Sequence, residues 1–195
     1  MSSSQSEYND KAEARFLIAK INFYENNFEK SLSVLSNIKE DLANNLSNDA
    51  IELGMIINVG KRDSINLSKF ANADFLTTQQ RLAEAETEYK ILSENKNIFF
   101  INNISRYKYA ELLIAQSKYD IAIEVLKELS DSQAMNIFED RRFYLLAQVY
   151  EFGIKDEKSA IATYEKFLEM FPNSLYLEKS QKNLMTLKNN RSKNL

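Results

Sequence analysis

The chain has 195 residues and a formal net charge of −3, and its length suits one domain or one array of repeats. Three glycines and one proline are too few for the many turns of an all-β fold, so the composition favours long helices with short connections. The absence of histidine and cysteine removes the usual zinc ligands, the thiol nucleophile and the commonest general base. We therefore expect no enzyme, no metal and no cofactor.

The most regular signal is a pair of small residues that lie twelve or thirteen positions apart. Two antiparallel helices joined by a tight turn pack closely only where their side chains are short. The second member of each pair also opens an apolar stripe at i, i+4 and i+7, as in Ala160, Tyr164 and Phe167, which indicates one face of an α-helix. Each pair therefore predicts the crossing of two helices in a hairpin. The pairs are Ala19 with Ser31, Ala73 with Ala85, Ala110 with Ala122, and Ala147 with Ala160.

Four hairpins and a terminal helix follow from this spacing in chain order. Pro172 pushes the residue before it out of helical geometry and so ends the last hairpin. The helix after it places Leu177, Leu184 and Leu187 on one side, which suits a cap over the stacking face that the last hairpin would otherwise expose. The predicted hairpins cover about 9–42, 63–96, 100–132 and 138–171, and the capping helix covers about 174–189.

An inserted helix over about 49–59 is expected between the first two hairpins. Ser31 and Ala85 are 54 residues apart, which is about 17 more than one repeat needs. Gly60 can end this helix, because glycine commonly adopts the left-handed conformation that follows a helix. The apolar residues of the insert either pack beside the first hairpin or form a lip that grips a partner.

The end of the chain is strongly basic. Residues 179–195 contain five basic and no acidic residues, so this segment carries +5 and the rest of the chain carries −8. Either the segment is a solvated helix whose basic end suits the helix dipole, or it meets an anionic partner.

The pattern resembles the tetratricopeptide repeat (TPR) family over most of the chain. The second small residues recur after 37 and 38 positions, against 34 in the family. Phe28, Leu82 and Tyr119 match the bulky residue of the turn into the second helix, and Pro172 matches the proline that closes a repeat. The resemblance implies an all-α fold, a right-handed α-solenoid of antiparallel helix hairpins with a C-terminal capping helix, as a single array over 1–195.

The repeats also depart from the family pattern. Arg15, Lys69 and Arg106 stand where the family has a large aromatic residue early in the first helix, and only Phe143 is apolar there. The turn of the last repeat carries one extra residue. We interpret the chain as a divergent array of bacterial type. The run that begins at Ala160 is similar to repeats of bacterial outer-membrane-assembly lipoproteins and periplasmic coordinators.

The resemblance implies that the first helices of the hairpins line a concave, ligand-holding face. An aromatic row beside a mostly acidic row would suit an extended or helical peptide that carries Lys or Arg. Alternatively, the aromatic row packs between neighbouring repeats. The implied ligand-facing residues are Phe16, Phe70, Tyr107 and Tyr144 in the aromatic row, Lys20, Asp74, Glu111 and Gln148 in the next turn, and Tyr24 and Glu151 beyond it.

These observations favour a non-catalytic protein–protein interaction scaffold that binds a peptide or protein partner. The alternative is a structural subunit of a bacterial envelope or outer-membrane assembly complex. The phosphate-binding and nucleophile-elbow motifs are absent, and nucleic acid is not expected because the chain is acidic outside its last helix. No apolar run reaches the length of a membrane span, and the N-terminus lacks a secretory signal. The location is thus cytoplasmic or, if a signal was removed, periplasmic, and the oligomeric state stays open.

Overall fold

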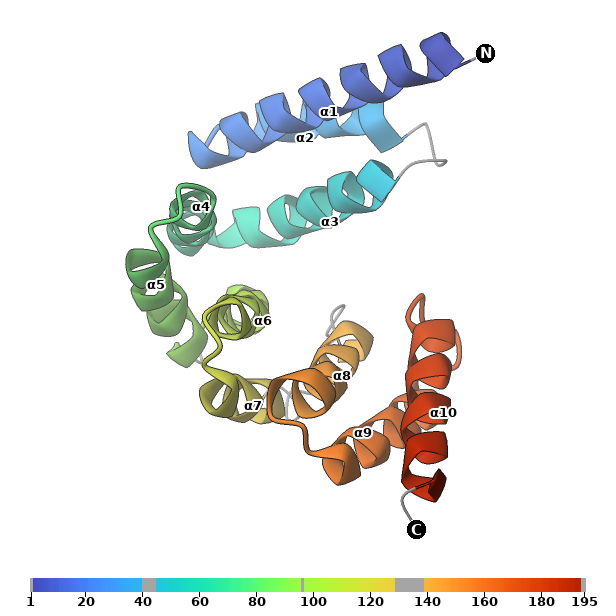
Figure 1. Ribbon diagram of the computed structural model, residues 1–195. Helices are drawn as coiled ribbons and strands as arrows, with labels where there is room; N and C mark the ends of the chain where they lie inside the picture. Colours follow the sequence, from blue (N-terminus) through green and yellow to red (C-terminus); the bar gives the residue numbers. More distant parts are fainter. Residues whose placement is uncertain (1, 40–44, 96, 129–138, 194–195) are drawn as a thin grey trace. The chain divides into compact units, whose positions relative to one another are not determined.

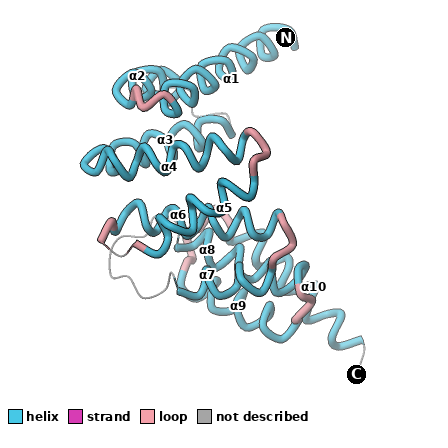
Figure 2. Tube along the Cα trace, turned by 90° about the vertical axis from the view of Figure 1, so that its left-hand side faces the viewer, coloured by secondary structure: helices cyan, strands magenta, loops and turns pink. Residues whose placement is uncertain are grey.

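All regular structure in the described part of the chain is helical (Figures 1 and 2). The computed structural model describes residues 2–39, 45–95, 97–128 and 139–193. Consecutive helices pack against one another from α1 to α5 and from α7 to α10, which confirms the all-α helical-repeat prediction. The predicted hairpin ends at 40–42, 96, 129–132 and 138 lie outside the described residues. Residue contacts divide the chain into two compact units, 1–101 and 102–195, and each unit is described by itself.

Unit 1 contains two hairpins with one helix between them. In the first hairpin α1 and α2 lie side by side, and α3 packs mainly against α2 (Figure 1). A short 3-10 turn, η1, then leads into the second hairpin, in which α4 packs against α5. The elements are α1 Ser2–Tyr24, α2 Phe28–Lys39, α3 Asn45–Gly60, η1 Lys61–Asp63, α4 Ser64–Thr78 and α5 Leu82–Glu94.

Unit 2 holds most of α6, since the boundary between the units falls near the start of that helix. Its core gathers buried side chains from α7, α8, α9 and α10 around Leu146 and Tyr164. Leu184 and Leu187 of α10 belong to this core, so α10 covers the outer face of α9. The elements are α6 Phe99–Ala115, α7 Tyr119–Glu128, α8 Glu139–Gln148, a π-helical turn η3 Val149–Gly153, α9 Glu157–Met170 and α10 Leu177–Lys193.

The paired small residues are all interior. All eight side chains are fully buried, as close packing of the hairpin helices requires. In the first hairpin, where serine replaces the second alanine, the Ser31 hydroxyl donates to the Ala19 carbonyl at 2.8 Å. The close approach that short side chains permit thus includes a direct hydrogen bond between α2 and α1, and the buried hydroxyl is satisfied.

The turns of the hairpins share one conformation, although none uses glycine for it. Asn26, Gln80, Ser117 and Lys155 have φ between 57° and 61°, in the left-handed region. In the first three turns, the N–H of the next residue donates to a carbonyl five positions back, at 2.8 to 3.0 Å. This is the Schellman motif that satisfies the last carbonyls of a helix. Because a Cβ atom disfavours the left-handed region, these turns carry a conformational cost that glycine would relieve.

The extra residue of the last repeat is absorbed by a π-helical turn. Ala147 and Ala160 are thirteen positions apart, and η3 lies between them. The Ile154 N–H donates to the Val149 carbonyl at 3.0 Å, an i to i−5 bond that holds one residue more than an α-turn. Gly153 is needed at its end, because a Cβ atom there would lie 2.9 Å from the ring of Tyr119. The chain therefore keeps the crossing of α8 and α9 and accommodates the insertion in the turn.

The helix α3 ends at Gly60, as predicted, but not through the left-handed conformation. Gly60 has φ −71° and ψ −25°. The residue instead makes room for packing, since a Cβ atom would lie 2.8 Å from Leu67 Cδ1. The chain turns at Asp63, whose side chain caps α4 by accepting from the Asn66 N–H at 3.3 Å. The helix α3 packs against α2 of the first hairpin, while Met55 and Val59 on it stay exposed.

A buried arginine joins two helices of unit 2. Arg142 donates from Nη1 to the Leu126 carbonyl at 2.7 Å and from Nη2 to Glu139 at 2.5 Å. Leu126 lies in the last turn of α7, where carbonyls have no partner within the helix. The guanidinium therefore satisfies the end of α7 and ties it to the first turn of α8.

Candidate functional site

The predicted ligand-facing residues fall in both units. Phe16, Lys20, Tyr24, Phe70 and Asp74 belong to unit 1. Tyr107, Glu111, Tyr144, Gln148 and Glu151 belong to unit 2.

In unit 1 the predicted residues largely bind one another. The Tyr24 hydroxyl donates to Asp74 Oδ2 at 2.8 Å, and Lys20 Nζ lies 5.5 Å from the centre of the Tyr24 ring. Burial and the nearby Asp74 carboxylate raise the pKa of the Tyr24 phenol, so it stays neutral and acts as a donor. Phe70 is only 2% exposed and packs edge-on against Tyr89 at 5.8 Å. At Phe70 the aromatic row therefore serves packing between helices, while Phe16 stays half-buried.

In unit 2 Tyr107 forms the floor of a polar cluster. Its side chain is 3% exposed, and its hydroxyl donates to Glu111 Oε1 at 3.0 Å. The other Glu111 oxygen accepts from Lys108 Nζ at 2.9 Å. Burial, and then the Glu111 charge, raise the pKa of Tyr107, so its phenol is a hydrogen-bond donor and not a base. Arg141 lies over the Tyr107 ring, with Cζ 6.0 Å from the ring centre.

Tyr144 stacks on a residue that the sequence did not indicate. Its ring lies parallel to that of Tyr176 within 21°, with centres 4.7 Å apart. Tyr176 reaches this place because the Ser174 hydroxyl oxygen accepts its N–H at 3.1 Å and shapes the turn before α10. Gln148 Nε2 donates to the Tyr144 hydroxyl at 3.2 Å. Burial raises the pKa of Tyr144, followed by the effects of Glu151 and Tyr176.

Glu151 is held by the helices that follow it. Its Oε2 accepts from the Tyr164 hydroxyl at 2.8 Å and from Asn183 Nδ2 at 3.3 Å. Asn183 also donates to the Tyr164 hydroxyl at 2.9 Å. Glu151 lies within the π-helical turn, so the inserted residue places a carboxylate where α9 and α10 meet. Burial, with a smaller contribution from this carboxylate, raises the pKa of Tyr164.

The arrangement in unit 2 defines what we call the tyrosine surface. Its members are half-buried and lie on α6, α8 and the turn before α10, with Tyr107 beneath them. Arg141 adds a positive charge beside Glu111, so the surface has mixed charge. The sequence could have indicated Arg141, because this residue lies in the first turn of α8, three residues before Tyr144. The tyrosine surface consists of Glu111, Arg141, Tyr144, Gln148 and Tyr176.

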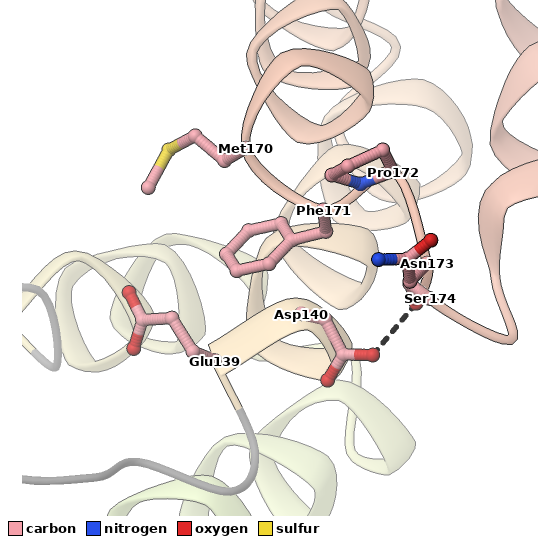
Figure 3. A pocket seen from close by; sticks show the side chains of 7 residues that line it. All are labelled: Glu139, Asp140, Met170, Phe171, Pro172, Asn173 and Ser174. Atoms are coloured by element: carbon pink, nitrogen blue, oxygen red, sulfur yellow. Dashed lines mark hydrogen bonds between the residues drawn. The ribbon is translucent and has the colours of Figure 1, made fainter.

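A shallow pocket of about 340 Å³ lies elsewhere in unit 2, where α8 begins and α9 ends. The Ser174 hydroxyl donates to Asp140 at 2.6 Å, and in Figure 3 the Phe171 ring lies between Met170 and the two acidic residues Glu139 and Asp140. None of the predicted residues lines this pocket. Among the described residues, no group of three or more acidic side chains is placed to hold a metal ion. The lining residues are Glu139, Asp140, Met170, Phe171, Pro172, Asn173 and Ser174.

The fold and this surface define a helical-repeat protein that presents side chains from successive hairpins. Residues 143–174 match the family model described as tetratricopeptide repeat, from Phe143 to just beyond Pro172, and this match supports the TPR assignment. A comparison with curated proteins and another with solved structures each found no match. TPR repeats are protein–protein interaction modules and generally non-catalytic scaffolds, so the match indicates protein partners. Within the described ranges, none of the helices has the length and apolar character to cross a membrane.

Proposed function

We propose that this chain is a non-catalytic interaction scaffold and that it binds a peptide or protein partner at the tyrosine surface of unit 2. The observation that carries this proposal is the stacked pair Tyr144 and Tyr176, which is half-buried and whose Tyr144 hydroxyl accepts from Gln148. Tyrosine is enriched at protein interfaces because it offers a large apolar ring and a polar end.

The surface is preorganised by its own hydrogen bonds. Gln148 holds the Tyr144 hydroxyl, and Ser174 holds the backbone of Tyr176. Side chains that are already ordered lose little freedom on binding, which preserves affinity. A partner would place an apolar or aromatic side chain against the rings, and its backbone would bond to Gln148 and Glu111. The raised pKa of Tyr107 and of Tyr144 speaks against nucleophilic or base chemistry by these phenols.

The proposal is tested with peptides selected from a displayed random library on the immobilised wild-type protein. Selected peptides are titrated against wild type, Tyr176→Ala and Glu111→Lys, with the helical circular dichroism signal of each variant recorded. We expect at least tenfold weaker binding to both variants, about 1.4 kcal/mol each.

The matched control is Phe152→Ala, because Phe152 is an exposed aromatic residue in the turn between α8 and α9 and lies outside the surface. Its affinity for the peptides should equal that of wild type. Selected peptides that bind Tyr176→Ala and Glu111→Lys as tightly as wild type would show that the tyrosine surface is not the binding site.

A further inference from the structure

The shallow pocket of unit 2 adjoins the tyrosine surface. Asp140, which lines the pocket, precedes Tyr144 by four residues on α8, so both lie on one side of the helix, about 6 Å apart along its axis. Ser174 also lines the pocket, and its hydroxyl accepts the N–H of Tyr176, which stacks on Tyr144. A ligand on the stacked tyrosines would therefore reach the pocket with a neighbouring side chain.

The end of α9 gives the pocket an apolar side, formed by Met170, Phe171 and Pro172 (Figure 3). Phe171 packs against Phe143 with ring centres 5.5 Å apart, and Lys166 lies over Phe143, outside the pocket lining. An aromatic ring attracts a cation and also packs against the aliphatic stem of a long side chain. The volume of about 340 Å³ is at the low end of the range for ligand pockets, about 300–1,000 Å³, so it suits one side chain.

The start of α8 gives the pocket a carboxylate that has no ionic partner. Glu139 is paired with the buried Arg142, so these two charges offset each other. Asp140 accepts from two neutral donors, the Ser174 hydroxyl at 2.6 Å and the Arg141 backbone N–H at 2.7 Å. Within the described residues, no lysine or arginine side chain pairs with the Asp140 carboxylate.

The helix ends do not cancel this charge. The pocket lies where α8 begins and α9 ends, so the positive end of one helix dipole meets the negative end of the other. An anion in the pocket would be repelled by Asp140, and an uncharged apolar side chain would remove this carboxylate from water without a partner. A lysine or arginine side chain suits both sides of the pocket, because it joins an apolar stem to a cation.

We infer that the pocket is a second subsite of the tyrosine surface and that it takes a Lys or Arg side chain of the partner peptide. The stem lies against Phe171 and the cation meets Asp140. The inference rests on the proposed function, since the same peptide occupies the stacked tyrosines. In an extended peptide, side chains two positions apart point to one side and lie about 6.5 Å apart. The basic residue should therefore stand two positions from the side chain that contacts Tyr144 and Tyr176.

The test uses two synthetic peptides derived from one that is selected on the immobilised wild-type protein. One is the selected peptide, and the other carries methionine in place of its basic residue, which keeps the length and removes the charge. Both are titrated against wild type and Asp140→Asn. Asparagine keeps the size of the side chain and an oxygen that accepts from Ser174, so the turn that holds Tyr176 is preserved. We expect Asp140→Asn to bind the basic peptide at least about tenfold more weakly and the methionine peptide as wild type does.

Two controls separate a charge contact from a structural role. Asp120→Asn removes an exposed carboxylate from the first turn of α7, and neither peptide should change its affinity. The affinity of the basic peptide should fall with added salt more steeply for wild type than for Asp140→Asn, because salt screens the charge pair. An Asp140→Asn variant that weakens both peptides equally would show that Asp140 only supports the turn, and the inference would be wrong.

The remaining outcomes distinguish the subsite from the tyrosine surface. If both peptides bind wild type equally, or the selected peptides lack a basic residue at the expected spacing, the inference is overturned. When Tyr176→Ala nevertheless weakens the same peptides, the tyrosine surface stands without this subsite. Peptides that bind Tyr176→Ala as tightly as wild type, or a library that yields no binding peptide, would overturn the proposed function and this inference together.

Discussion

The first and the last hairpin share one register and differ in what covers them. In the last hairpin, the apolar side of α8 packs against α7, and Leu184 and Leu187 of α10 cover α9. In the first hairpin, the corresponding side of α1 presents Ile18 and Ile21 to solvent. The crossing of the two helices is buried in both cases. A hairpin can therefore complete its own crossing, whereas its stacking faces depend on a neighbour.

In either hairpin, a large side chain at the helix crossing should lower the stability of the protein more than one at any exposed position. Ala160→Arg introduces a large charged side chain where no space exists, and we expect a loss of about 4 kcal/mol or more from overpacking and charge burial. Chemical denaturation followed by circular dichroism measures this loss. The control is Ala162→Arg on the exposed side of the same helix, which should stay near wild type. Equal stability of the two variants would disprove the close approach at Ala160.

Weakening the contact between α10 and α9 should strongly destabilise the last hairpin. Leu187→Ala deletes a buried side chain that joins α10 to the core, and we expect a loss of about 2–4 kcal/mol. Met185→Ala, on the solvent side of α10, should cost less than about 0.5 kcal/mol. The melting temperatures of the two variants test these expectations. If the two temperatures are equal, α10 does not act as a cap.

A substitution in a left-handed turn should change the free energy of unfolding by less than the changes above, and it should stabilise the protein. Gln80 has φ 59°, so Gln80→Gly should stabilise the protein by about 0.5–1 kcal/mol. Gln79 precedes it with φ −80°, where glycine brings only added freedom to the unfolded chain, so Gln79→Gly should destabilise slightly. The denaturation midpoints of the Gln80→Gly and Gln79→Gly variants test this prediction. A Gln80→Gly variant that is less stable than wild type would show that the left-handed turn is not a cost.

The smallest expected effect is a pH dependence at the cap of the last hairpin, where the first hairpin has no titrating side chain. Asp156 caps α9, and its hydrogen bonds with Ser159 hold its pKa below the ordinary value of 3.8. Its stabilisation is therefore present above that ordinary value and is lost as the pH falls through the lower, folded-state pKa. Asp156→Asn should keep the cap and remove this part of the acid dependence. The first hairpin has Asn27 at the corresponding position, which does not titrate. Stability measured from neutral to acid pH checks this prediction, which fails if both proteins lose stability in parallel.

Some features of the candidate site were beyond sequence reasoning for a physical reason. The helical period placed Tyr107 and Tyr144 in one row, yet Tyr107 is buried and Tyr144 is only half-buried. A repeat register tells which residues share a face, but the exposure of each depends on the neighbours that pack against it. Tyr176 stacks on Tyr144 because of the turn at Ser174, and no periodicity connects these residues.

The amino-acid sequence by itself determined the helical hairpins and their crossings, because short side chains at a repeated spacing are a local requirement for close helix packing. It also indicated the cap, through the apolar side of the last helix. Only the tertiary structure decided that the extra residue becomes a π-helical turn, that Gly60 yields space to Leu67, and that Arg142 binds the end of α7. These outcomes depend on contacts between segments distant in sequence, where steric fit and hydrogen bonding select one local geometry among several allowed ones.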